Sequence, residues 1–173
     1  MDDFGKRLQA MGLSVPAAPK PQGTYVPAVR TGNLVFVAGQ LPMREGKLIF
    51  TGKVGREVSL EQAQEAAQVC FLNALAALAF LGIAPAQVTR VVRLGGFVQC
   101  VDGFSEQPKV INGASDLCRA LFGDAGAHAR LAVGVHALPL NAPVEIEALF
   151  EVGGSGEYGK VREASDPSKG AAA

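Results

Sequence analysis

Two side chains in the last third of the sequence have the types and the spacing to do chemistry, Arg130 and Glu145. Residues 128–138 and 144–152 each alternate polar and apolar side chains with a period of two, which predicts two strands. The turn-forming residues between them predict an antiparallel hairpin. Only a register that places the two apolar rows together buries both beneath a cover, so we expect Arg130 and Glu145 to share the opposite, uncovered face.

The residues that follow Arg130 on the same face of its strand have small side chains or none. Ala132 and Gly134 cannot fill the space beside the guanidinium, and a hollow next to this planar cation could bind a carboxylate through two parallel hydrogen bonds. A simpler interpretation is also open, because most exposed strand charges form surface ion pairs of little energetic value. His136, on the same row, is more often a solvated strand residue than an acid or a base.

Two helices are expected to cover the sheet that carries these strands. Ser59 followed by Gln62 is a capping-box variant that predicts the start of a helix, and Gly82 ends it. A second helix is predicted from near Pro108 to Phe122. The apolar positions at helical spacing are Leu60, Ala63, Ala67, Cys70, Phe71, Ala74, Leu78 and Leu81 in the first, and Val110, Ile111, Ala114, Leu117, Cys118 and Leu121 in the second.

Two β-branched, apolar runs predict further strands at residues 34–39 and 88–98, and residues 48–50 predict a short partner for the first run. Gly95 and Gly96, within the second run, allow either a bulge or the close approach of a partner or ligand. Both helices need one common sheet to cover. The order ββαβαβ therefore predicts an α+β domain in which one mixed sheet carries two helices on one face.

The composition describes one domain without net charge. The 173 residues are 49% hydrophobic, enough for a core of ordinary size, and sixteen basic side chains balance sixteen acidic ones. No global field would attract nucleic acid or an anionic membrane. The longest apolar stretches fall short of the roughly 20 residues that cross a bilayer, and Met1-Asp2-Asp3 differs from the basic start of a signal peptide. We expect a cytoplasmic protein whose partner is a small molecule or another copy of itself.

The two ends differ from the central domain, residues 21–152. Residues 1–20 combine a short amphipathic segment with three prolines and form an N-terminal extension, and residues 153–173 lack apolar periodicity and are predicted to be disordered. Three cysteines without CxxC spacing predict buried thiols, with neither a disulfide nor a metal framework. They are Cys70, Cys100 and Cys118.

The order of several motifs resembles the Rid (YjgF-like) family. The similarity runs over roughly residues 20 to 152. Its most specific mark is a strand-borne Ala-Arg, followed by a Leu-Pro turn and an Ile-Glu-rich strand. The stretches that carry the resemblance are Tyr-Val-Pro-Ala-Val at 25–29, Gly-Asn-Leu-Val-Phe-Val-Ala-Gly-Gln-Leu-Pro at 32–42, Ala129-Arg130, Leu138-Pro139 and Val-Glu-Ile-Glu-Ala at 144–148.

This resemblance implies a chorismate-mutase-like fold and a homotrimer with ligand clefts between its subunits. Family members that carry the arginine hydrolyse reactive imines and enamines, such as 2-aminoacrylate, to 2-keto acids and ammonia. By resemblance, Arg130 grips the substrate carboxylate and Glu145 lies near the attacking water. The positions that match the family's binding residues are Tyr25, Gly39, Asn112 and, in place of the usual cysteine, Ala132. No cofactor or metal is implied.

The sequence also departs from the family pattern. Active members commonly carry cysteine and glutamate where this chain has Ala132 and Gly134, and residues 105–109 hold about four extra residues, which indicates a divergent branch.

Two other functions stay open. A non-catalytic binder or sensor of small carboxylates would need Arg130 alone. Ribonuclease activity, an older label in this family, is disfavoured because the chain lacks a histidine pair, a basic stripe and a cluster of stacking aromatic residues.

Overall fold

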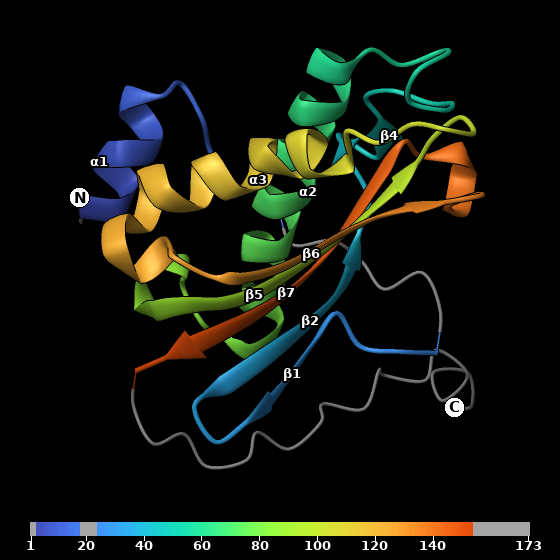
Figure 1. Cartoon of the computed structure of the whole chain (residues 1–173). Helices are drawn as coiled ribbons and strands as arrows, with labels where there is room; N and C mark the ends of the chain where they lie inside the picture. Colours follow the sequence, from blue (N-terminus) through green and yellow to red (C-terminus); the bar gives the residue numbers. More distant parts are fainter. Residues whose placement is uncertain (1–2, 18–23, 154–173) are drawn as a thin grey trace, which may run out of the picture.

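A five-stranded mixed sheet, covered by helices on one face, forms the body of the molecule in the computed structural model, which describes residues 3–17 and 24–153 (Figure 1). The helices are α1 (Asp3–Ala10), α2 (Leu60–Ala77) and α3 (Gln107–Phe122). The strands are β1 (Ala28–Thr31), β2 (Leu34–Gln40), β3 (Met43–Arg44), β4 (Lys47–Leu48), β5 (Val88–Gln99), β6 (Ala129–Val135) and β7 (Val144–Val152).

The strand order in the main sheet is β1-β2-β7-β5-β6. Strands β5 and β6 are parallel, and the other pairs of this sheet are antiparallel. A parallel pair needs a crossover, which α3 supplies between β5 and β6. The predicted hairpin of residues 128–138 and 144–152 is therefore wrong: β6 lies at the sheet edge, and β7 is inserted between β2 and β5.

The first strands also differ from the prediction. Residues 28–31 form β1, which pairs with β2, and Lys47–Leu48 pairs with β3 in a separate two-stranded hairpin. The main sheet thus follows the order ββαβαββ. It has as many strands as the five segments expected from the sequence, although residues 28–31 take the place expected for residues 48–50, and the order ββαβαβ was one strand short. The α+β class, the mixed sheet and the placement of the two long helices on one face are confirmed.

The limits of the two long helices agree with the local signals in the sequence. The Ser59 hydroxyl accepts a hydrogen bond from the backbone N–H of Gln62 at 3.2 Å, and the Gln62 side chain accepts one from the N–H of Ser59 at 2.9 Å. This capping box satisfies two donors at the start of α2. Helix α2 continues as a 3-10 turn and ends at Gly82, whose φ of +69° suits glycine. Helix α3 ends at Gly123.

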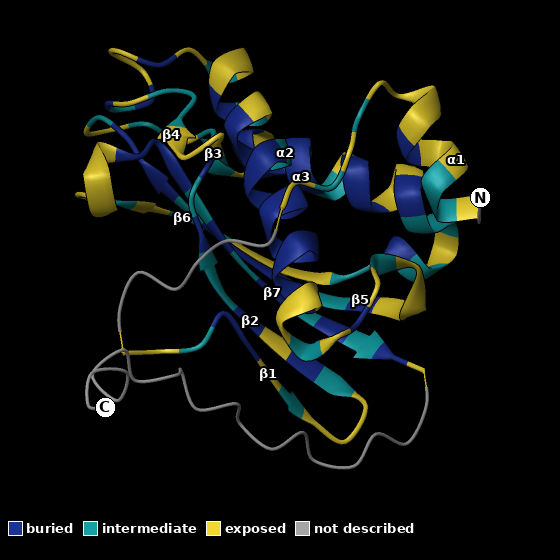
Figure 2. Ribbon diagram, turned by 180° about the vertical axis from the view of Figure 1, so that it is seen from behind, coloured by how far each residue is buried: buried dark blue, intermediate teal, exposed yellow. Residues whose placement is uncertain are grey.

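The core lies between α2, α3 and one sheet face (Figure 2). At Gly96 of β5, an added Cβ would come within 2.5 Å of the Ile111 side chain on α3. At Gly113 of α3, an added Cβ would come within 2.2 Å of the Gln64 carbonyl oxygen on α2. Gly95 faces the other side of the sheet, where its Cβ would collide with Glu147. These glycines therefore allow close approach, while the irregular pairing in β5 falls earlier, between Val88 and Arg93.

Helix α2 and its 3-10 extension form an unusually apolar segment. Among the described residues, Leu60–Leu81 is the one helix long and apolar enough, at 22 residues, to cross a membrane by length and composition. The expectation that no stretch approached this length was wrong. In the structure 67% of its most apolar window is buried, which is typical of a core helix.

The N-terminal helix packs against the end of α3. A guanidinium nitrogen of Arg7 donates to the Leu121 carbonyl at 2.8 Å, and the rings of Phe4 and Phe122 lie 5.3 Å apart. Helix α1 therefore covers the C-terminal end of α3. The domain limits proposed from the sequence stay predictions, and residues 154–173 of the expected disordered tail lie outside the described part of the chain.

Candidate functional site

Arg130 lies on the helix side of the edge strand β6. Its partner on β5 is Leu94, which is fully buried beneath the helices, and residues paired across neighbouring strands share a face. The Arg130 Nη1 donates to Asn112 Oδ1 at 2.7 Å and to Ser115 Oγ at 3.1 Å, both on α3. The expectation that Arg130 lies on the uncovered face is wrong, because β5 rather than β7 sets the register of β6.

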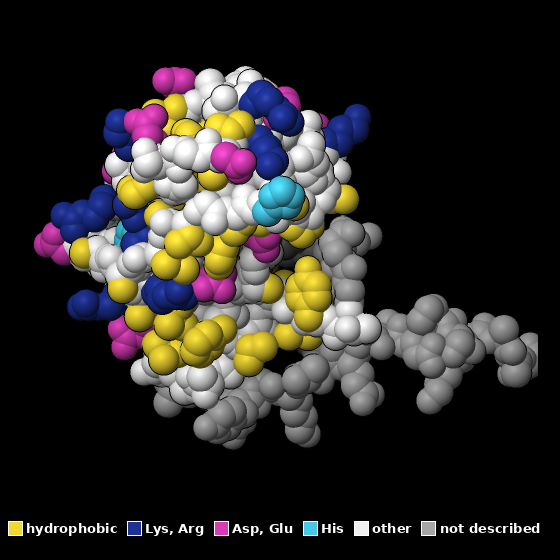
Figure 3. Space-filling view, turned by 45° about the vertical axis from the view of Figure 1, so that its right-hand side comes forward, with side chains coloured by type: hydrophobic (Ala, Val, Ile, Leu, Met, Phe, Trp, Pro, Cys, Tyr) yellow, Lys and Arg dark blue, Asp and Glu magenta, His cyan; other side chains and the backbone are white. Residues whose placement is uncertain are grey.

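The apolar row of β6 takes the opposite side. Leu131 pairs with Gly95 and Val133 with Phe97, so both face the uncovered side of the sheet. Val29 and Phe36, on β1 and β2, are about half exposed on the same side. Figure 3, which brings the right-hand side of Figure 1 forward, shows hydrophobic side chains gathered there with basic and acidic groups between them. An apolar surface of this kind is typical of faces that contact another protein or a ligand.

The predicted hollow beside the arginine is filled. An added Cβ at Gly134 would lie 2.9 Å from Gln107 Nε2 and 3.0 Å from Cys100 Sγ, so these side chains occupy the space that the glycine leaves. Ala132 packs against the edge of the core. The small residues of β6 thus allow α3 and the loop before it to approach, and the expectation of a hollow at these positions is wrong.

The guanidinium of Arg130 nevertheless keeps one edge available. Arginine carries five N–H donors in a plane, and helix α3 takes hydrogen bonds from Nη1 alone. Within the described residues, no acceptor contacts Nε or Nη2. These two groups point along the same edge of the plane, in the geometry that binds a carboxylate through two parallel hydrogen bonds.

Two residues that the sequence reasoning missed extend the contacts of Arg130. The Ser115 hydroxyl lies 3.0 Å from His128 Nε2, and His128 Nδ1 lies 2.7 Å from the Gly126 carbonyl oxygen. Their spacing was the available signal: Ser115 follows Asn112 by three residues on one helix face, and His128 precedes Arg130 by two at the start of a strand. We name Arg130, Asn112 and Ser115 the arginine half-site.

Glu145 lies on the uncovered side of β7, opposite Phe97. An added Cβ at Gly39 would come within 1.9 Å of Glu145 Oε1, so only glycine leaves room for this carboxylate. Partial burial raises the pKa of Glu145, and the nearby Glu147 raises it further. Glu147 itself pairs with Arg93. The structure thus brings Gly39 and Glu145 together, and we name this pair the carboxylate half-site.

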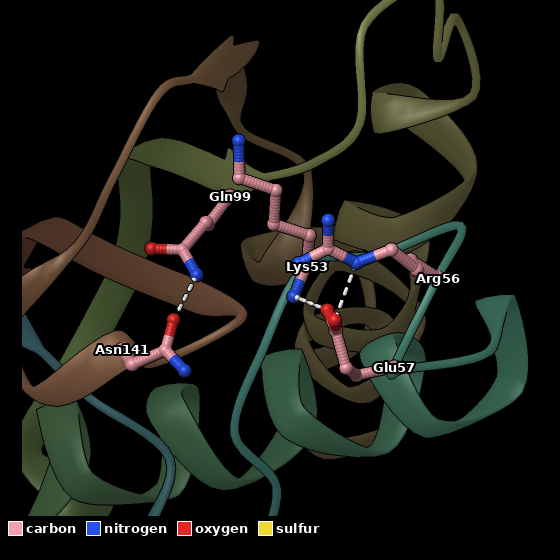
Figure 4. A network of polar contacts seen from close by, with 5 residues as sticks. All are labelled: Lys53, Arg56, Glu57, Gln99 and Asn141. Carbon is pink, nitrogen blue, oxygen red and sulfur yellow. Dashed lines mark hydrogen bonds and ion pairs between the residues drawn. The ribbon is translucent and has the colours of Figure 1, made fainter.

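Polar contacts around the buried Gln99 side chain hold the turn that leads into β7 (Figure 4). The Gln99 side chain accepts from the backbone N–H of Leu138 at 2.7 Å and donates to Asn141 Oδ1 at 2.6 Å. At the same end of the sheet, Glu57 accepts from the backbone N–H of Lys53 at 2.8 Å. These bonds fix the loops beside the start of β7 and so the position of the carboxylate half-site.

Tyr25 precedes β1 and is half exposed. Within the described residues, no hydrogen bond or ring contact joins it to Arg130 or Glu145. Its neighbour Val26 lines a hollow of about 390 Å³ on the uncovered face. The hollow is also bounded by Val29, Phe36, Val37, Ala38, Arg93, Glu147, Ala148 and Leu149. His136 is exposed beyond the end of β6.

Arg130 and Glu145 therefore belong to two separate half-sites on opposite faces of one sheet.

Among the described residues, no group of three or more His, Cys, Asp and Glu side chains is arranged to hold a metal ion. The three cysteines are buried, as predicted. Burial raises the pKa of the Cys70 thiol and that of the Cys118 thiol far above the ordinary value.

Several known proteins are similar to this chain in sequence and in fold. The profile of the YjgF/chorismate mutase-like family, whose description also carries an endoribonuclease label, matches residues 5–151. Protein TCP17 of Trypanosoma cruzi is 42% identical, over 84% of this chain and 91% of its own. A 2-iminobutanoate/2-iminopropanoate deaminase of Dermatophagoides farinae is 32% identical, over 81% and 94%. A crystal structure of an Agrobacterium tumefaciens protein of unknown function has 46% identity and a TM-score of 0.82, over 88% and 94% of the two chains.

Proposed function

The chain belongs to the YjgF/chorismate mutase-like family, and from this premise we propose that it hydrolyses imines or enamines of small carboxylic acids, of the 2-aminoacrylate type, to 2-keto acids and ammonia. The observation that carries the proposal is the Arg130 guanidinium, which helix α3 holds through Nη1 while Nε and Nη2 stay available. A planar fork of this kind recognises a carboxylate in a defined orientation. The 2-iminobutanoate/2-iminopropanoate deaminase name of the mite relative supports the same reaction class.

The complete site is proposed to lie between identical subunits. Arg130 and Glu145 cannot meet within one chain because the sheet separates them. They can meet when the β6 edge of one copy packs against the uncovered face of the next. Such a contact joins two different surfaces, and it closes into a ring if the rotation between copies allows. A homotrimer is the ring we propose, with the apolar row of Leu131 and the exposed Phe36 buried in it.

The proposed chemistry needs little machinery. Arg130 binds the substrate carboxylate, which fixes the adjacent imine carbon in the cleft. A water molecule attacks that carbon and gives a proton to Glu145, whose raised pKa makes its carboxylate a stronger base than an ordinary glutamate. Return of this proton to nitrogen gives a carbinolamine; Glu145 then transfers the hydroxyl proton to the same nitrogen, so that the C–N bond breaks, ammonia leaves and the new C=O bond completes the 2-keto acid. We propose that the partners of the protein are this small substrate and other copies of the chain, rather than a nucleic acid or a membrane. We also propose a cytoplasmic location.

A coupled assay tests the proposal. Imines are generated from alanine and 2-aminobutyrate by an amino-acid oxidase with catalase, and the rate of 2-keto acid release is followed with wild type and with Arg130→Ala. Wild type should accelerate release and the variant should lose most of the acceleration. Binding of 2-oxobutanoate without acceleration would instead assign a carboxylate sensor. The absence of both would show the proposed function to be wrong.

A further inference from the structure

We propose that Ser115 and His128 are positioning residues that hold the Arg130 guanidinium for its ligand. They join the arginine to the backbone through three successive contacts: Arg130 Nη1 to Ser115 Oγ at 3.1 Å, Ser115 Oγ to His128 Nε2 at 3.0 Å, and His128 Nδ1 to the Gly126 carbonyl oxygen at 2.7 Å. This inference rests on the proposed function of Arg130 as the carboxylate ligand.

The chemistry of the end groups sets the direction of these hydrogen bonds. The Gly126 carbonyl can only accept, so His128 Nδ1 carries a proton and donates it. In the neutral imidazole Nε2 is then an acceptor, and the Ser115 hydroxyl donates to it. The hydroxyl oxygen keeps its lone pairs for Nη1 of Arg130, which can only donate. Every group in the chain thus has the partner that its chemistry requires.

This direction makes Ser115 a fixed acceptor. A free hydroxyl rotates and offers its lone pairs in many directions, whereas a hydroxyl whose proton is held by an imidazole presents them in one. Each bond in such a chain also polarises the next. Asn112, one helical turn before Ser115, supplies the second acceptor at Nη1. The two acceptors together fix the plane of the guanidinium and therefore the direction of its Nε and Nη2 edge.

The contacts of His128 also involve the 3-10 turn that precedes β6. His128 is half-buried, and its ring lies between the backbone of the 3-10 turn Gly123–Gly126 and helix α3. An added Cβ at Gly126 would come within 2.3 Å of the Cys118 carbonyl oxygen, so glycine is required for this turn to sit close to α3. The turn therefore places the accepting carbonyl where the imidazole reaches both it and Ser115.

The experiment compares removal of each group with a conservative replacement. Ser115→Ala removes the acceptor, and Ser115→Thr keeps a hydroxyl. His128→Phe removes the ring nitrogens, and His128→Gln keeps an acceptor near the position of Nε2. His136→Phe, at the other histidine of the chain, is the matched control because His136 is exposed beyond the end of β6. Melting temperatures establish that each variant is folded.

The first readout is calorimetric binding of 2-oxobutanoate, with kcat and KM measured alongside. Loss of one hydrogen bond to a charged group should weaken binding by about fivefold to twentyfold in Ser115→Ala and His128→Phe. KM should rise in step while kcat changes little, and Ser115→Thr, His128→Gln and His136→Phe should stay near wild type. Wild-type affinity in His128→Phe, or a fall in kcat with unchanged affinity, would overturn the positioning role; the latter would point to Ser115 as a reacting group.

The second readout is the Arg130 Nε–H signal in nitrogen-15 NMR spectra, which does not depend on any ligand. Fixed geometry should give one sharp signal in wild type and a broadened one in Ser115→Ala and His128→Phe. If wild type neither binds 2-oxobutanoate nor accelerates 2-keto acid release, the proposed function is wrong, and this signal alone decides the positioning role. Unchanged signals in both variants would overturn it.

Discussion

Arg130 and Glu145 lie on opposite faces of the same sheet, because their partners on β5, Leu94 and Phe97, are three positions apart along a regularly paired strand, and an odd offset changes the face. Leu94 points beneath the helices and Phe97 points to the uncovered side. A site that uses both charged groups cannot be built within one chain. The edge position of β6 and the apolar character of the uncovered face make a contact between copies the natural way to combine them.

The first prediction concerns assembly. Wild type should run in light scattering at about three times the mass of one chain, which is 17.9 kDa. Leu131→Arg should shift the protein toward monomer, because it places a charge in the apolar row that we expect to be buried between copies. Met11→Arg, an exposed residue after α1 on the helix side, is the control and should leave the mass unchanged. A monomeric wild type at micromolar concentration would contradict the shared cleft.

The second prediction concerns the guanidinium itself. Arg130→Lys keeps the charge but loses the planar fork, so it should fail almost as badly as Arg130→Ala. Both should lower kcat/KM for carboxylate-bearing imines, by an amount that corresponds to a loss of roughly 1.5–3 kcal/mol of transition-state stabilisation. The melting temperature should change little because the side chain is exposed. Arg90→Ala, another exposed arginine of the same sheet, is the control. A Lys variant with wild-type kcat/KM would show that charge alone is enough.

The third prediction follows from the raised pKa of Glu145. A carboxyl whose pKa is higher in the folded chain favours folding while it is protonated and costs stability once it ionises. Glu145→Gln should therefore raise the melting temperature at pH 7.5, and this gain should shrink as the pH falls from the raised pKa toward the ordinary range of glutamate and be absent below it. Glu151→Gln, on the same row of β7, is the control. A variant less stable than wild type at pH 7.5 but equal to it in acid would contradict the sign.

The fourth prediction concerns the thiols. Cys70 and Cys118 are fully buried, and burial raises the pKa of both. In the native protein Ellman's reagent should react rapidly with at most one thiol, that of Cys100, which is 9% exposed. All three should react in guanidinium chloride, and Cys100→Ser should abolish the native reaction. Two or more fast thiols in the native protein would show that the core opens readily.

Local signals in the sequence were sufficient for the helices. The capping box at Ser59 and the glycines Gly82 and Gly123 determine helix ends through contacts only a few residues apart. The motif resemblance also grouped Asn112 with Arg130 among the binding positions, and the structure brings their side chains into contact. These features depend on near neighbours or on patterns specific to the family.

The strand pairing could not be obtained in this way. Two alternating segments joined by a short turn look like a hairpin, yet a helical crossover pairs β6 with β5 instead. Alternation shows that Leu131 and Ala132 face opposite sides, but not which side the helices cover. The more apolar row was expected beneath the helices. Instead, this apolar row faces away from the helices, where the proposed assembly would bury it. Arg130 therefore faces helix α3, and the contacts of Ser115 and His128 were missed because they depend on this orientation of the arginine.

Mixing two inactive variants tests the shared cleft most directly. Arg130→Ala and Glu145→Gln are co-expressed with different tags, mixed oligomers are isolated, and the rate of 2-oxobutanoate release from its imine is measured. If one subunit supplies the arginine and its neighbour the glutamate, one of the three sites in each isolated mixed trimer contains both wild-type residues, whichever variant is present in two copies. We therefore predict recovery of about a third of the wild-type rate, whereas mixed oligomers no more active than the separate variants would contradict a site built from two subunits.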